Sequence, residues 1–241
     1  MKRRCNAREF AVGIDGCRAG WIAAFLAGGR TSFEILATIE SAWPRLRGAS
    51  RILIDVPIGM ADTKRQCDLE AKRLLGRHNS RVFLTPPRIA AFAASYPEAN
   101  RLCREIAGFG LSKQTWNILP KVREIDQFLE STPEARGHLR ECHPEICFAK
   151  LAGVPIADNK KTERGAALRL ESLADLLPGV REDLDEASRR IYFKQATRDD
   201  MMDALVAAVV AASPESALRT LPSHPTQDAR GLAMEMVYRV P

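Results

Sequence analysis

The sequence predicts an α/β fold in a single domain, and three observations support this prediction. Its 241 residues are 46% hydrophobic and 27% charged, which is enough for one globular core and excludes a disordered or fibrous chain. Apolar runs typical of strands occupy the first sixty residues, whereas helical patterns dominate the rest. No internal repeat or linker divides the chain. We therefore expect one domain over residues 1–241, with a helical insertion at about 60–135.

The expected strands are apolar runs bounded by glycine or proline. Six runs are predicted to form strands: Phe10–Ile14, Trp21–Leu26, Thr31–Ile39, Arg51–Pro57, His138–Cys142 and Leu232–Val240. Gly28 and Gly29, between the second and third runs, predict a hairpin. The fourth run is apolar almost throughout, which is typical of a strand covered on both faces, and Pro57 ends it.

Helical patterns fill much of the remaining chain. They are predicted at these positions: a short turn at Ser41–Leu46, then Asp62–Leu75, residues 89–132, Thr162–Leu177, Glu182–Gln195 and Asp199–Ala212. Asp62 is the expected N-cap of the second of these, and its basic side chains, which include Arg65, are expected to face solvent. Residues 77–88 lack a helical period and predict an ordered loop, and Pro120 is expected to interrupt the helices of the insertion.

Charge and hydropathy restrict the class of protein. Thirty-six Lys and Arg against thirty Asp and Glu give a net charge of +6, with +9 on residues 1–104 and −3 on residues 105–241. This basic surplus permits a polyanionic partner without requiring one. The longest apolar stretch, Ala204–Ala212, is about half of what a membrane-spanning helix needs. Because no apolar signal-peptide segment follows the charged start Met1–Arg4, we expect a cytoplasmic protein that spans no membrane.

The cysteines do not point to a metal site. The six cysteines contain no Cys-x-x-Cys pair, so neither a disulfide framework nor a zinc site is indicated. Cys142, His143 and Cys147 could ligate a metal, but partly buried reduced thiols are the favoured interpretation.

Two acidic residues end strands in unusually apolar surroundings. Asp15 is flanked by Gly13 and Gly16, which allow a ligand or another backbone to approach closely. Asp55 repeats this arrangement within the most hydrophobic run of the protein. If the two strands are neighbours, about 4.8 Å apart, the two carboxylates can share one cation, and without it they repel.

Further acids lie in the second half of the chain. Asp200 and Asp203 are three residues apart and share one face of the last predicted helix. Beyond Asp203 this helix is apolar on every side, which predicts that it is buried and that Asp203 needs a hydrogen-bonded partner or a metal. Glu145 adds an acid just past a predicted strand, and Pro144 restricts its approach.

Each acid also has a purely structural interpretation. Asp15 and Asp55 can bond backbone amides at turns. Asp200 can complete a capping box begun by Thr197, and Glu145 can stabilise a helix N-terminus. Taken together, the acids favour a shared site, because a hard cation needs oxygen ligands brought from separate elements.

Several motifs carry a resemblance to a known family. The motifs are Gly13–Trp21, Ile54–Gly59, Arg65–Asp68, Ser80–Phe83, Lys113–Trp116, Glu141–Phe148, Lys160–Thr162 and Asp199–Leu205. On these motifs, most of the chain resembles the domain of unknown function 429 family, which is described as predicted ribonuclease H-like, or RuvC-like, nucleases. The resemblance implies a mixed five-stranded sheet in the order 3-2-1-4-5, with its first three strands antiparallel, helices on both faces and a helical insertion.

The same resemblance implies a site and a reaction. Asp15 matches the invariant acid of the first strand, and Asp55 the acid that ends the fourth, where RuvC-type resolvases commonly carry Glu. This departure leaves open which acids bind metal directly. The implied reaction is hydrolysis of DNA or RNA by two Mg²⁺ or Mn²⁺ ions about 4 Å apart, with one ion activating a water and the other stabilising the leaving oxygen. The implied metal ligands and catalytic residues are Asp15, Asp55, Glu145, Asp200 and Asp203.

The expected partner is nucleic acid. Its backbone would be bound by basic side chains, which serve equally well as a solvated surface: Lys160, Lys161, Arg65 and Arg18. Trp21 is expected in the core. Two other functions stay open, a non-catalytic nucleic-acid- or protein-binding scaffold and an actin-like ATP-dependent kinase. The kinase is disfavoured because no Walker or Gly-x-Gly-x-x-Gly segment is present. The sequence leaves the oligomeric state open.

Overall fold

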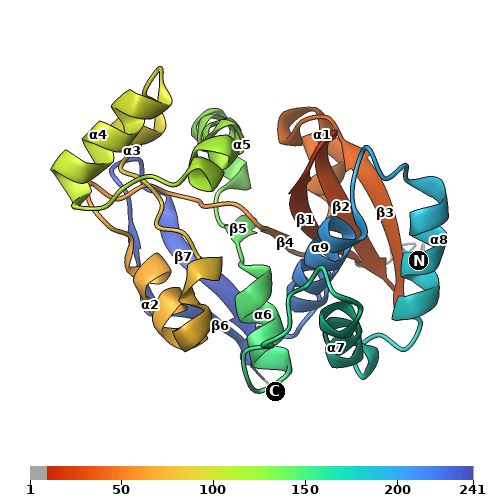
Figure 1. Cartoon of the computed structure of the whole chain (residues 1–241). Coiled ribbons are helices and arrows are strands. Elements are labelled where there is room, and N and C mark those ends of the chain that lie inside the picture. The colour runs from red at the N-terminus through yellow and green to blue at the C-terminus, as the bar shows by residue number, and fades with distance from the viewer. Residues whose placement is uncertain (1–9, 241) are drawn as a thin grey trace.

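The computed structural model describes residues 10–240, and its main sheet is mixed and five-stranded (Figure 1). The strands are β1 (Phe10–Cys17), β2 (Gly20–Ala27), β3 (Arg30–Leu36), β4 (Ile52–Ile54) and β5 (Leu139–Glu141). Their order is β3-β2-β1-β4-β5. Strands β1 to β3 are antiparallel, and β4 and β5 run parallel to β1. The predicted α/β class and ribonuclease H-like strand order are confirmed. Met1–Arg4 and Cys5 lie outside the described residues.

Helices cover both faces of this sheet. Val12 and Ile14 of β1 pack into a core that includes side chains of α1 (Ile39–Leu46) and α5 (Lys113–Ser131). Ala11 lies in a second core on the opposite face. The helices of that second core are α6 (Pro144–Leu151), α7 (Glu163–Ala174), α8 (Val180–Arg190) and α9 (Arg198–Ala211). All residues of α9 from Met201 to Ala211 are buried, so the predicted burial of this helix is confirmed.

The backbones of α9 and β1 meet at Gly13. A Cβ atom at this position would lie 2.1 Å from both the carbonyl oxygen of Ala204 and the amide nitrogen of Ala208. Only glycine allows such an approach. Because residues two apart on a strand share a face, Asp15 lies on the same side of the sheet as Gly13, toward the start of α9.

The chain between β4 and β5 forms the insertion, and the C-terminal strands form a second sheet. The helices of the insertion are α2 (Gln66–Leu75), α3 (Arg88–Ala91), α4 (Tyr96–Ala107) and α5. Strands β6 (Leu218–Gln227) and β7 (Ala233–Arg239) pair antiparallel next to α2 and α6 (Figure 1). Strand β6 was missed by the sequence prediction because Pro222 and Pro225 interrupt its alternation of apolar residues.

Three predicted boundaries were wrong. Helix α2 begins at Gln66, and Asp62 is exposed in the preceding loop rather than serving as an N-cap. Helix α5 continues through Pro120, whose ring is exposed and therefore displaces no packed neighbour. Helix α8 ends at Arg190, so residues 191–197 form a connecting turn instead of a helix. No helix in the described part of the chain is both long enough and apolar enough to cross a membrane.

The contact at Gly13 predicts a large effect on stability. We expect Gly13→Ala to lower the free energy of unfolding by about 3 kcal/mol or more, because its methyl group can be accommodated only if α9 moves away from β1. Urea denaturation measures this change. Gly48→Ala is the control, since its added methyl group would meet neighbours at 3.7 Å or beyond, an ordinary contact distance, and a loss within about 1 kcal/mol is expected. Equal losses in the two variants would contradict the prediction.

Candidate functional site

Three of the predicted acids meet at the carboxyl ends of β1 and β4. Asp15 lies within β1, opposite Ile22 of β2, and is 8% exposed. Asp55 directly follows β4, and its amide donates to the carbonyl oxygen of Ile14 at 2.9 Å. Asp203 is 3% exposed on α9, next to the residue that contacts Gly13. The fold therefore brings together three carboxylates that are far apart in the sequence.

Burial and mutual repulsion make the charged forms of these acids costly. Burial raises the pKa of Asp15 well above its ordinary value, and the charges of Asp55 and Asp203 add to this shift. Burial also raises the pKa of Asp55 to about 7, although Lys160 opposes the shift. The pKa of Asp203 is raised to about 6 by burial, again against the effect of Lys160. The three carboxylates thus form one electrostatic unit.

Lys160 supplies the positive charge within this unit. Its ammonium donates to Oδ2 of Asp203 at 2.5 Å. Although burial opposes its charge, the neighbouring carboxylate of Asp203 raises the pKa of Lys160, and Asp15 and Asp55 contribute. The loop that carries Lys160 is held close to α7, because a Cβ at Gly165 would lie 2.0 Å from the carbonyl oxygen of Asn159.

The other two predicted acids are engaged elsewhere. Glu145 accepts from Arg81 at 2.6 Å and from Arg169 at 2.7 Å, one guanidinium on each carboxylate oxygen. Although burial favours its protonated form, these arginines lower the pKa of Glu145. Asp200 forms the capping box: its carboxylate accepts from the amide of Thr197 at 2.8 Å. Its charge still acts on Asp15. Asp200 thus has the capping role that the sequence left open, whereas the two arginine contacts of Glu145 were not predicted.

The carboxylates surround an ammonium rather than a prearranged set of metal ligands. Over residues 10–240, no three Asp, Glu, His or Cys side chains are arranged to hold one metal ion. Asp203 is bonded to Lys160, and Oδ1 of Asp15 accepts from the amide of Gly16 at 2.7 Å. The cysteines of the described chain are free thiols, and both Cys142 and Cys147 are buried.

Arg65 is not part of a solvent-facing basic surface, so that prediction was wrong. Its side chain is 1% exposed and donates to Asp68 at 2.6 Å and to Glu141 at 2.7 Å. It also donates to the carbonyl oxygen of Ile58 at 3.0 Å. Arg65 precedes α2 and points into the core, where it joins the loop after β4 to β5. Arg65 therefore cannot contact a nucleic-acid backbone. The buried Glu141 within an expected strand was the sequence signal for such a partner.

The other predicted basic residues lie at the surface near the acids. Lys161 is exposed beside Lys160, and Arg18 is exposed in the turn between β1 and β2. Sequence reasoning assigned Lys160 to the phosphate backbone and missed its pairing with Asp203, because the contact joins residues forty-three positions apart.

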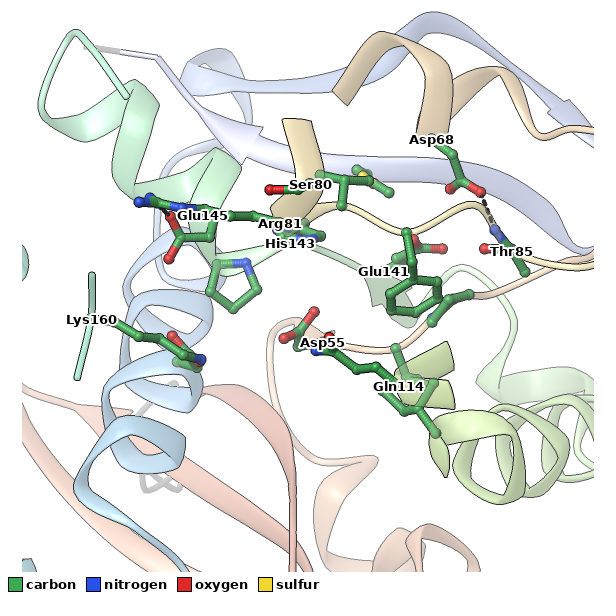
Figure 2. A pocket seen from close by; sticks show the side chains of 18 of the residues that line it. Asp55, Asp68, Ser80, Arg81, Thr85, Gln114, Glu141, His143, Glu145 and Lys160 are labelled. Atoms are coloured by element: carbon green, nitrogen blue, oxygen red, sulfur yellow. Dashed lines mark hydrogen bonds and ion pairs between the residues drawn. The ribbon is translucent and has the colours of Figure 1, made fainter. Parts of the chain in front are cut away.

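A cavity of about 380 Å³ opens beside the acids. Figure 2 shows Asp55 and Lys160 on one side of it and Thr85, which is hydrogen-bonded to Asp68, on the other. The remaining lining includes polar side chains from the insertion and from the start of α6: Ser80, Arg81, Gln114, His143 and Glu145. The Oγ1 of Thr85 and the Nδ1 of His143 are buried and have no hydrogen-bond partner among the described residues.

A second cavity, of about 510 Å³, adjoins the first. The two cavities share Lys160 and Asp203, so this ion pair lies between them. The second cavity is lined by further basic side chains: Lys161, Arg169, Arg181 and Arg198. Besides the shared pair, these basic side chains outnumber the two acids of the lining, Glu163 and Asp199, so an anionic group can approach the carboxylates from this side.

The raised pKa of Asp55 predicts a pH-dependent effect on stability. Because the folded state holds its proton up to about pH 7, against an ordinary value of 3.8, the wild-type protein loses stability relative to Asp55→Asn as the pH rises from about 4 to about 7. Above pH 7 the difference in stability between the two proteins is constant. Urea unfolding at several pH values, with a chelator present, measures it. Glu134→Gln, at an exposed site, is the control and should show no such trend.

The prediction would be contradicted if the wild type and Asp55→Asn differed in free energy of unfolding by the same amount at about pH 5 and at about pH 8. The comparison with the variant is needed because other groups titrate in the same range. The pKa of His143 is lowered by burial, which makes stability rise with pH below about 6.5 and opposes the effect of Asp55 in the wild-type protein.

Comparison with known proteins agrees with the resemblance seen in the motifs. A family model matches residues 13–227, a range that includes the five predicted acids. No curated protein and no solved structure matches the chain. The chain belongs to the family described as "Protein of unknown function (DUF429)".

Proposed function

We propose that this protein is a nuclease that hydrolyses phosphodiester bonds of DNA or RNA and depends on Mg²⁺ or Mn²⁺. The observation that carries this proposal is the meeting of Asp15, Asp55 and Asp203 at one buried sheet edge, beside a cavity. Acids with a structural role are normally saturated by hydrogen bonds or guanidinium groups, as Glu145 is here. Within residues 10–240, the one ammonium that donates to any of these three is that of Lys160, which bonds Asp203.

The donor chemistry of the three aspartates fits a hard divalent cation. Mg²⁺ and Mn²⁺ prefer carboxylate oxygens, and three carboxylates against one ammonium leave a net negative charge when all are ionised. Only burial and neighbouring charges shift the pKa of Asp55, with no hydrogen bond contributing. When bound, the metal would activate a water and stabilise the leaving oxygen. The proposal includes two metal ions, which is the number that the family resemblance implies.

Lys160 must leave Asp203 before a cation can take its place. The lysine side chain is 38% exposed, whereas that of Asp203 is 4% exposed, so Lys160 is the partner that can move outward. Once displaced, its ammonium can bind a phosphate oxygen of the substrate. Lys161, Arg181 and Arg198, on the second cavity, would add backbone contacts that do not depend on the base sequence.

Glu145 and Asp200 have positioning roles in this proposal. Glu145 joins α6 to α7 through its contact with Arg169. Through Arg81 it also joins α6 to a segment of the insertion that lines the first cavity. Asp200 caps α9 and so fixes the helix turn that carries Asp203.

Loss of the carboxylate at position 15 tests the proposed activity. We expect Asp15→Asn to reduce Mg²⁺- or Mn²⁺-dependent cleavage by about 1,000-fold or more, because a hard metal ligand is lost. Cleavage of single-stranded, duplex, hybrid and branched substrates measures it. Asp62→Asn, at an exposed site in the loop before α2, is the control and should retain activity. A wild-type protein that binds these substrates but cleaves none of them would contradict the proposal and support a scaffold.

Removal of Lys160 tests the metal site without an activity assay. We expect Lys160→Met to lose about 1–2 kcal/mol of stability in a chelator, because Asp203 loses its partner. Added Mn²⁺ should then raise the melting temperature of this variant more than that of the wild type, since the ammonium no longer competes with the ion. Lys161→Met, at the exposed neighbouring lysine, is the matched control and should behave as the wild type. Equal shifts with Mn²⁺ in all three proteins would contradict metal binding at Asp203.

A further inference from the structure

The turn between α8 and α9 presents two neighbouring aromatic side chains to solvent. Tyr192 is 59% exposed and Phe193 is 63% exposed, and their ring centroids lie 5.4 Å apart. By contrast, Trp21 is buried in the core, as predicted, and its indole N–H donates to Glu124. Contiguous exposed apolar groups often mark a binding surface.

This turn is held in place by hydrogen bonds. The amide of Gln195 donates to the carbonyl oxygen of Tyr192 at 2.7 Å, and the amide of Tyr192 donates to the side chain of Gln195 at 3.3 Å. The carbonyl oxygen of Gln195 in turn accepts from the amide of Ala19, in the β1–β2 turn, at 3.1 Å. The aromatic pair is therefore fixed beside the end of β1.

The same turn leads directly to the acids of the candidate site. Thr197 begins the capping box of α9, and Asp203 lies on the second turn of that helix. The turn also contacts Ala19, which lies in the turn that follows β1, the strand that contains Asp15. The aromatic turn is therefore joined to the two elements, β1 and α9, that carry Asp15 and Asp203.

The charges around the pair favour a polyanion over a protein or a second copy of the chain. Arg18, Arg189 and Lys194 are exposed and form no ion pair within residues 10–240. The Nζ of Lys194 lies 6.0 Å from the ring centroid of Tyr192. Of the nearby acids, Asp185 pairs with Arg198 and Glu186 pairs with an arginine of its own helix. Asp199 and Asp200, in the first turn of α9, form no ion pair within residues 10–240, and the three cations outnumber them.

We propose that Tyr192 and Phe193 form a stacking platform for unpaired bases of single-stranded nucleic acid, with Arg18, Arg189 and Lys194 binding its phosphates. Aromatic faces stack on any base, and unpaired cations follow the backbone, which together give binding that is independent of sequence. This inference rests on the proposed function and restricts its substrates to nucleic acids with an unpaired stretch.

Binding in the absence of metal tests the platform separately from cleavage. We expect the double variant Tyr192→Ala with Phe193→Ala to bind a short oligodeoxythymidine about 10-fold or more weakly than the wild type, in a chelator, by fluorescence anisotropy. A fluorescent adenine analogue within the oligonucleotide should be quenched by the wild type through stacking and not by the double variant. Tyr192→Phe keeps the ring and should bind as the wild type does.

Val154→Ala is the matched control, because Val154 is 64% exposed on another part of the surface, and it should not alter binding. Unchanged affinity and quenching in the double variant would overturn the platform, even if Asp15→Asn abolishes cleavage. Binding and quenching without cleavage by the wild type would support the platform and contradict the nuclease. A double variant that changes only the oligomeric state would overturn the platform and identify the pair as a contact between copies.

Discussion

The backbone contact between α9 and β1 at Gly13 is the constraint on which the candidate site depends. It places the buried part of α9 directly over the central strand, so that Asp203 meets Asp15. The parallel pairing of β4 with β1 then adds Asp55 at the same edge. Three carboxyl groups are thereby gathered where hydration is poor, and ionising all of them costs free energy through burial and mutual repulsion.

The protein offsets its buried acids in two different ways. Glu141 and Glu145 each accept two hydrogen bonds from guanidinium groups, and these contacts connect separate elements. Within the described residues, the side chain of Asp203 is bonded only to the ammonium of Lys160, which lies on a loop and is partly exposed. An arginine fork stays charged and fixes geometry, whereas a lysine is a compact charge on a flexible stem. The arginine contacts suit a structural role, and the lysine contact suits a site at which another cation can replace the ammonium.

Two cavities and elements outside the main sheet surround the acids. The two cavities meet at the Lys160–Asp203 pair, and the basic lining of the second one gives an approach for phosphate groups. The insertion and the β6–β7 sheet form much of the other wall, with Gln114 and Met236 among its residues. Elements outside the five-stranded sheet therefore shape the space beside the acids, and the sheet and α9 position the acids themselves.

The strand order of the main sheet was expected only from the family resemblance. The sequence by itself determined most strands and helices along the chain, the burial of α9 and the positions of acids at strand ends, because local periodicity and single-residue chemistry encode these features. It missed β6, where prolines obscure the pattern, and extended α8 through the aromatic turn. Only the tertiary structure decided which charges pair. Arg65 belongs to the core, Glu145 to two arginines and Lys160 to Asp203, since an ion pair depends on the distance between groups far apart in the chain. Periodicity carries no information about that distance.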